Sequence, residues 1–153
     1  MTGFSTVDFQ DLNTTELYQV LALRSEVFVL EQQCAYQDMD GLDAQCHHIL
    51  GQLKDGQVIA YARILPPELT QNETVSIGRV VVAADHRKEN MGKQLMLFSI
   101  KAAQNLFPNH QIEISAQSYL THFYQNLGFV NTGNFYLEDD IPHQTMIYRP
   151  ITE

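Results

Sequence analysis

The chain has 153 residues and a formal net charge of −9 at pH 7, and 44% of its residues are hydrophobic. A chain of this length can bury a full core, so we expect a single domain over residues 1–153. The acidic balance argues against nucleic-acid and anionic-membrane partners, because both require clustered positive charge. The sequence has no apolar stretch long enough to span a bilayer and no basic segment followed by an apolar run at its N-terminus, which predicts a cytoplasmic protein.

The first half of the chain predicts a strand, a helix and a hairpin. Residues 4–9 alternate apolar and polar side chains, as in a half-buried strand. Asn13, with Glu16 three positions later, resembles a capping box and begins a helix that should end near residues 32–33. After an acidic loop, an Asp-Gly turn joins two strands at residues 46–53 and 58–65.

The second half predicts two more helices between strands. A β-branched central strand begins near Thr74, and a helix follows Gly92 until Pro108 breaks it. The later elements are a strand at 110–117, a short helix at 118–128, and strands at 129–137 and 143–148. The order βα, βββ, α, β, α, ββ predicts an α/β (α+β) fold, with a mixed, mostly antiparallel central sheet flanked by helices.

Residues 87–93 join the central strand to its helix and have the composition of a phosphate-binding turn. Arg87 and Lys88 supply cations, Asn90 and Gly92 accept positive φ, and the start of a helix offers free N–H groups. An ordinary strand-to-helix turn needs the same residue types, so both interpretations stay open at this point.

The sequence predicts no metal site. In a calcium loop counted from Asp38, the glycine is at the fourth position instead of the sixth, and Ile49 occupies the twelfth position, where a glutamate is required. Cys34, Cys46, His47 and His48 lack the spacing of zinc ligands. Two cysteines are also too few for a disulfide scaffold, which agrees with reduced thiols.

Several motifs resemble the GCN5-related N-acetyltransferase (GNAT) superfamily and, more narrowly, its ElaA-like branch. The segment Arg87-Lys88-Glu89-Asn90-Met91-Gly92 is similar to the superfamily's Arg/Gln-x-x-Gly-x-Gly/Ala loop, with asparagine at the first glycine position. Tyr124, Gly128 and Phe129 fit a second superfamily motif, in which Gln117 stands where asparagine is usual. Residues 23–43, the segments Tyr61-Ala62-Arg63 and Ile77-Gly78-Arg79-Val80, and Ile141-Pro142-His143 resemble the ElaA-like branch.

This resemblance implies a GNAT fold and an N-acetyltransferase that moves an acetyl group from acetyl-CoA to a primary amine of a small molecule or protein by direct attack. It places the diphosphate on the loop amides and the pantetheine arm along the central strand. The residues expected to bind acetyl-CoA are Val80, Val81, Val82, Arg87, Lys88, Glu89, Asn90, Met91, Gly92, Lys93, Gln117 and Tyr124.

The resemblance also implies catalytic roles. Tyr124 matches the family's general acid, which protonates the leaving thiolate. The base is open, because the central strand carries no carboxylate between Glu73 and Asp85. The candidates are His143, Glu113 and ordered water.

Further roles are left open by the sequence. Arg24, Arg63 and Arg79 either hold a substrate carboxylate or pair with Glu31 and the loop aspartates. The acidic loop from Asp38 to Asp43 is expected to attract a cation such as a polyamine or a lysine side chain. The mechanism does not need Cys34. The acceptor, the acyl length and a homodimer are undetermined, and the alternatives are a non-catalytic acyl-CoA sensor and an acyltransferase of the acyl-homoserine-lactone synthase type.

Overall fold

The structure, a computed structural model, describes residues 2–150 and contains one seven-stranded sheet in the order β1-β2-β3-β4-β5-β7-β6. Every neighbouring pair is antiparallel except β4 and β5, which are parallel. This mixed sheet flanked by helices confirms the predicted fold class. The strands are β1 (Gly3–Asp8), β2 (His47–Gln52), β3 (Val58–Leu65), β4 (Val75–Val82), β5 (Ile112–Gln117), β6 (Phe129–Glu138) and β7 (Ile141–Tyr148). The helices are α1 (Thr14–Arg24), α2 (Met91–Leu106) and α3 (Thr121–Leu127).

Most predicted elements are present, with small shifts at their ends. The capping box at Asn13 is formed, since its side chain accepts from the N–H of Glu16 and the Glu16 carboxylate accepts in return. The strand predicted from residue 110 begins at Ile112, because the N–H of His110 is used in a turn with the carbonyl of Phe107. The predicted continuous helix to residues 32–33 is α1 followed by a wider π-helical segment, Ser25–Glu31.

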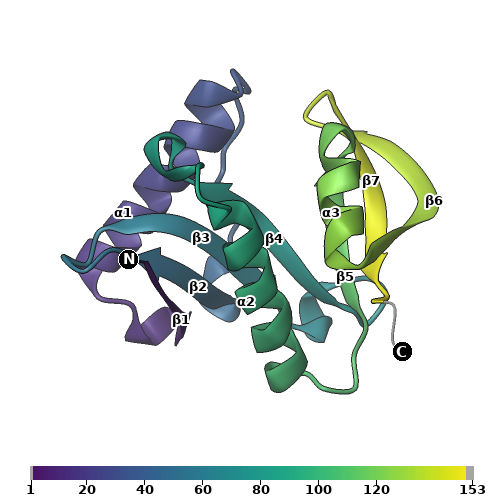
Figure 1. The fold of residues 1–153 in the computed structure, drawn as a ribbon, viewed down its shortest axis with the longest axis horizontal. Helices are drawn as coiled ribbons and strands as arrows, with labels where there is room; N and C mark the ends of the chain where they lie inside the picture. Colours follow the sequence, from purple (N-terminus) through teal and green to yellow (C-terminus); the bar gives the residue numbers. More distant parts are fainter. Residues whose placement is uncertain (1, 151–153) are drawn as a thin grey trace.

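Helices cover the two faces of the sheet and build two cores (Figure 1). Leu95 and Ile100 of α2 and Leu127 of α3 pack with Ile64 and Ile114 on one face. On the other face, α1 and the π-helical segment pack on β2, β3 and β4 through Val20, Leu23, Val27, Leu50, Tyr61 and Val81. Within residues 2–150, none of the helices combines the length and apolar character needed to cross a membrane.

The sheet divides between β4 and β5. These strands pair only at Val75 with Ile112 and at Ser76 with Glu113, and beyond these pairs they separate. Figure 1 shows β4 and β5 close together at one end and apart at the other, with α3 carried on the β5 side. Beyond Ser76 and Glu113, the facing edges of β4 and β5 therefore make no strand pairing with each other.

Strand β4 also contains a β-bulge on its β3 side. Val81 pairs with Tyr61 and Gly78 with Arg63, so Arg79 and Val80 together lie opposite Ala62. Arg79 has a φ of 50°, in the left-handed region that glycine normally occupies in such bulges. This conformation costs a non-glycine residue about 1–2 kcal/mol.

Candidate active site

The separation of β4 from β5 forms a central cavity of about 910 Å³. Its walls are β4, the loop before α2, the π-helical segment, β5 with α3, and the β6–β7 turn. Of the residues predicted to bind acetyl-CoA, all except Met91 line this cavity, while Met91 is buried in the core. The sequence-based set is thus brought together from three separate stretches of the chain.

The loop before α2 presents backbone donors to this cavity. Glu89 and Asn90 have φ values of 70° and 60°, and the Asn90 side chain makes no capping hydrogen bond to the helix. The first turn of α2 contains no acidic residue. The positive φ expected at Asn90 is present, but Gly92 is already helical and Glu89 is the second left-handed residue. Uncapped N–H groups at the start of a 16-residue helix can donate hydrogen bonds to an anion.

Arg87 ties this loop to its surroundings. Its Nε donates to the carbonyl oxygen of Val82 at 3.0 Å, and its Nη1 lies 2.8 Å from a carboxylate oxygen of Glu31 in the π-helical segment. Within residues 2–150, no ion pair is formed by Lys88 or Lys93. These two lysines therefore supply the loop's uncompensated positive charge.

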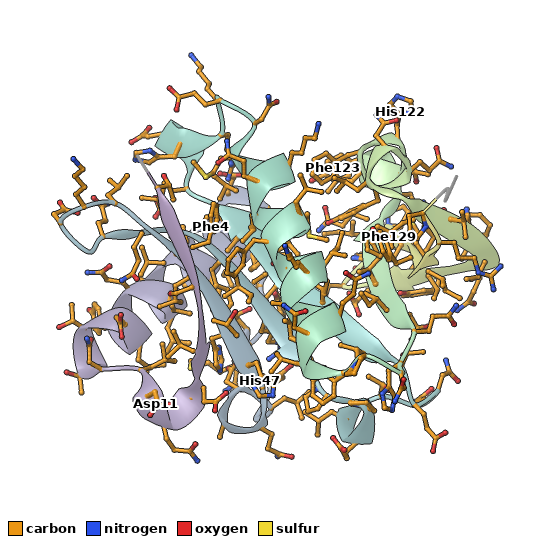
Figure 2. All side chains as sticks on the ribbon, turned by 60° about the horizontal axis from the view of Figure 1, so that its bottom comes forward. Phe4, Asp11, His47, His122, Phe123 and Phe129 are labelled. Carbon is orange, nitrogen blue, oxygen red and sulfur yellow. The ribbon has the colours of Figure 1, made fainter. Side chains whose placement is uncertain are left out.

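Tyr124 reaches the cavity from α3 and is only 7% exposed. Its ring packs edge-on against Phe123 and Phe129, with centroids 5.1 and 5.9 Å away. Burial raises the pKa of the Tyr124 hydroxyl to about 12, and nearby Tyr119 adds to the shift. The hydroxyl therefore keeps its proton near neutral pH and can act as a hydrogen-bond donor. Figure 2 shows the neighbouring Phe123 on the α2 side of α3, while His122 points away.

His143 lines the cavity from β7 and is 6% exposed. Its Nδ1 lies 2.7 Å from the carbonyl oxygen of Ile141, which can only accept, so Nδ1 carries the proton. Nε2 lies 3.3 Å from a carboxylate oxygen of Glu138 and faces it with a lone pair when the ring is neutral. Glu113 is placed differently: it accepts from the Thr74 hydroxyl at 2.8 Å and is not among the cavity-lining residues.

The loop aspartates are paired with arginines, so the expected attraction of a free cation to residues 38–43 is not supported. Arg24 contacts Asp38 at 2.8 Å and Asp43 at 2.7 Å, and Arg63 contacts Asp43 at 2.9 Å and also Asp40. Arg79 pairs with Asp38 at 2.8 Å and, more distantly, with Asp40 at 3.5 Å. Three positive and three negative side chains thus form a charge-balanced network.

Histidines and cysteines of the loop region have structural partners. His48 lies 2.6 Å from the Tyr61 hydroxyl, whereas its neighbour His47 pairs with Asp8 on the opposite face of the strand. Cys34 and Cys46 are both free thiols. The pKa of the Cys34 thiol is raised by desolvation and by Asp139 and Asp140, so little thiolate is present to carry an acyl group.

Comparison with known families agrees with this geometry. The family described as "Acetyltransferase (GNAT) domain" matches residues 10–150. This chain belongs to the GNAT family. As a GNAT acyltransferase it has the fold that binds acyl-CoA, and the family acts on amine acceptors in general.

Similar proteins indicate the branch of the GNAT family to which the chain is related. Protein ElaA of Escherichia coli is 40% identical over 145 residues, which is 94% of each chain, and its crystal structure superposes with a TM-score of 0.87. A UPF0039 protein of Schizosaccharomyces pombe is 40% identical over 139 residues, covering 90% of this chain and 91% of that protein. An acyl-CoA N-acyltransferase structure from Pseudomonas aeruginosa has 41% identity and a TM-score of 0.89, covering 97% and 99% of the two chains. The resemblance to the ElaA-like branch of the GNAT family is confirmed.

Sequence reasoning missed several cavity residues of this GNAT protein. Glu138 is not among the predicted site residues, and Glu31 was considered only as an arginine partner, although both line the cavity. The bulge at Arg79 gave no signal, because arginine has no preference for the left-handed region. The pairing of Arg79 with a loop aspartate is one of the two alternatives that the sequence left open, and the structure shows it with Asp38 as the partner.

The arginine network makes acid stability testable. Hydrogen bonding from Arg63 holds the pKa of Asp40 far below its usual range. Burial acts to raise the pKa of Asp43, but hydrogen bonds from Arg24 and Arg63 outweigh it and the net shift is downward. A carboxyl with a lowered folded-state pKa stabilises the fold above its unfolded pKa of about 4, and this contribution is lost as pH falls below that value.

We therefore expect the free energy of unfolding of wild type to decrease as pH falls from about 4 towards 2. In Asp40→Asn the decrease over the same pH range should be smaller, because asparagine does not titrate. Urea denaturation at a series of pH values measures both curves. Asp55→Asn, in the β2–β3 turn and outside the network, is the control and should follow wild type. Equal losses in Asp40→Asn and wild type would contradict the assignment.

Proposed function

We propose that this GNAT protein transfers the acetyl group of acetyl-CoA to a primary amine by direct attack. The supporting observation is that one cavity joins the uncapped start of α2 to the β4 bulge and the Tyr124 hydroxyl. A diphosphate at one end and a thioester at the other would need these features in this order. The family match and the resemblance to acyl-CoA N-acyltransferases support the same reaction.

Coenzyme A would bind mainly to main-chain groups of the protein. Its diphosphate would accept hydrogen bonds from the amides of residues 88–93, aided by Lys88 and Lys93. Its pantetheine arm carries amides, and Val80, Val81 and Val82 offer a strand edge from which β5 has already separated. Gln117 lies across the cavity from this edge.

The transfer requires a stabilised oxyanion and a protonated leaving group. The amine nitrogen attacks the thioester carbon, the carbonyl oxygen gains negative charge, and the carbon–sulfur bond then breaks. A main-chain N–H at the bulge of Arg79 and Val80 would donate to that oxygen. Tyr124 would donate to the departing sulfur, whose free thiol has a pKa near ~8.5.

His143 is the proposed base. Val80 and Gln117 each lie four residues beyond the last β4–β5 pair, and His143 is the cross-strand partner of Gln117. The imidazole therefore lies at the level of the bulge, on the other side of the cavity. An ammonium placed between Nε2 and the Glu138 carboxylate would donate to both acceptors and could pass its proton to Nε2. Glu113, held by Thr74 outside the cavity lining, is the weaker candidate.

The first test is acetyl-CoA binding together with release of free thiol in the presence of a panel of amines. Wild type should bind and release thiol only when an amine is present. Gly92→Glu should abolish binding, because it places a carboxylate at the diphosphate site. Lys101→Glu, further along α2 and outside the cavity lining, controls for added negative charge.

Other outcomes identify the alternatives. Binding of acyl-CoA without thiol release from any amine would favour an acyl-CoA sensor. Release only with long acyl donors would favour an enzyme of the acyl-homoserine-lactone synthase type. Absence of binding would overturn the proposed diphosphate site and with it the proposed function.

Tyr124→Phe tests the proton donor. Loss of the hydroxyl should lower kcat by about a hundredfold while leaving the KM for acetyl-CoA nearly unchanged, since the ring still fills its place. Steady-state thiol release measures both constants. Tyr148→Phe is the control, because Tyr148 packs on Phe129 in the same aromatic group but does not line the cavity. An unchanged kcat in Tyr124→Phe would exclude this role.

His143→Gln tests the base through its pH dependence. We expect kcat/KM to decrease by about a hundredfold at pH 7, and the deficit to shrink towards pH 10, where a typical amine with a pKa near ~10.4 has less need of a base. Glu138→Gln should raise the KM for the amine, whereas Asp140→Asn in the same turn should not. A deficit in His143→Gln that stays constant with pH would argue against proton transfer to His143.

A further inference from the structure

Strand β4 holds an arginine in a backbone conformation that arginine disfavours, at the point where the reaction needs a fixed donor. Arg79 has a φ of 50° inside the strand, within the β-bulge opposite Ala62. We propose that Asp38 is a positioning residue for acetyl transfer: it holds Arg79 in this conformation and thereby fixes the main-chain donor for the thioester oxygen. This inference rests on the proposed function.

Asp38 holds Arg79 at two points. Arg79 Nε donates to one Asp38 carboxylate oxygen at 2.8 Å, and Nη2 donates to the Asp38 carbonyl oxygen at 2.9 Å. Two bonds from a planar guanidinium fix its orientation as well as its distance. Tyr36 completes the arrangement, because its ring centroid lies 6.0 Å from the guanidinium carbon and its hydroxyl lies 3.4 Å from the same Asp38 oxygen.

Asp38 is itself fixed from the other side. Its second carboxylate oxygen accepts from Arg24 Nε at 2.8 Å, and its carbonyl oxygen also accepts from Arg24 Nη2 at 3.3 Å. Arg24, at the end of α1, is fully buried, and Asp38 is 7% exposed. The buried Asp38 carboxylate thus links the guanidinium of Arg79 to Arg24 at the end of α1.

The role of Asp38 is indirect. Asp38 is not among the residues that line the cavity, whereas Arg79 is. Without the Asp38 carboxylate, the guanidinium of Arg79 would keep only its bond to the Asp38 carbonyl oxygen and a longer ion pair with Asp40 at 3.5 Å. Arg79 would then be less firmly held in its left-handed conformation. The main-chain donor would then turn away from the oxyanion, which lowers kcat more than it affects ground-state binding of acetyl-CoA.

Asp43 offers a matched control in the same network. It also pairs with Arg24, at 2.7 Å, but its second partner is Arg63 at 2.9 Å. It does not line the cavity, and within residues 2–150 it makes no hydrogen bond to Arg79. Asp43→Asn therefore disturbs the network without releasing the bulge.

The experiment measures kcat, the KM for acetyl-CoA and the melting temperature of both asparagine variants, using the amine found with wild type. Asp38→Asn should lower kcat by about tenfold or more, with KM changed by less than about threefold. Asp43→Asn should lower the melting temperature to a similar extent but keep kcat within about twofold of wild type. A wild-type kcat in Asp38→Asn, or equal kcat losses in the two variants, would overturn the inference.

Glycine at position 79 separates positioning from stability. Glycine adopts a φ of 50° without strain, so Arg79→Gly should keep a higher kcat than Arg79→Ala, although both lose the guanidinium. In the Arg79→Gly background, Asp38→Asn should cause no further loss of kcat, because Asp38 acts through Arg79. Equal kcat values for the glycine and alanine variants, or a full Asp38→Asn loss in the glycine background, would also overturn the inference.

If Asp38→Asn does not fold, the comparison of glycine with alanine still tests whether the left-handed conformation at position 79 is needed, and equal kcat values would still overturn the inference. Failure of the proposed function looks different, because wild type would then release no thiol with any amine. A loss of positioning leaves an active wild type and changes only the variants.

Discussion

The separation of β4 from β5 after two residue pairs is the constraint on which the rest of the site depends. Each strand keeps its own helical cover, α2 on the β4 side and α3 on the β5 side, so the sheet can open without exposing its core. The opening leaves an unpaired strand edge at Val80–Val82, where backbone polar groups would otherwise need a partner. A ligand with its own amides would satisfy that edge, which lines a cavity of about 910 Å³.

Charge is distributed to suit such a ligand despite the net charge of −9. Lys88 and Lys93 stand at the uncapped start of α2, while the arginine network cancels its own charge against three aspartates. A buried network of this kind contributes little net stability, because desolvation offsets the attraction. Among the described residues, the buried Arg63 Nε even lacks a hydrogen-bond partner. The network is therefore better explained by the orientations it fixes than by stability.

The sequence predicted those features whose signals are local. Alternating side chains revealed the strands, the pair Asn13 and Glu16 revealed the start of α1, and the loop motif brought the cofactor residues into one region. What stayed hidden depends on contacts across the fold. The number of β4–β5 pairs and the bulge that places Arg79 and Val80 opposite Ala62 are set by how neighbouring strands diverge and align. The residue types at those positions do not predict these features.

Backbone strain between β4 and α2 is found at residues that line the cavity. The left-handed residues Arg79, Glu89 and Asn90 all line the cavity and stand at the two ends of the proposed ligand, near its thioester and its diphosphate. At both ends a main-chain N–H must point at an oxygen, and regular strand or helix geometry would aim it at protein instead. In the loop the left-handed conformation costs little free energy, because Asn90 tolerates it and the segment is exposed. The bulge lies inside a sheet and has no such freedom, which is why its conformation requires a buried partner such as Asp38.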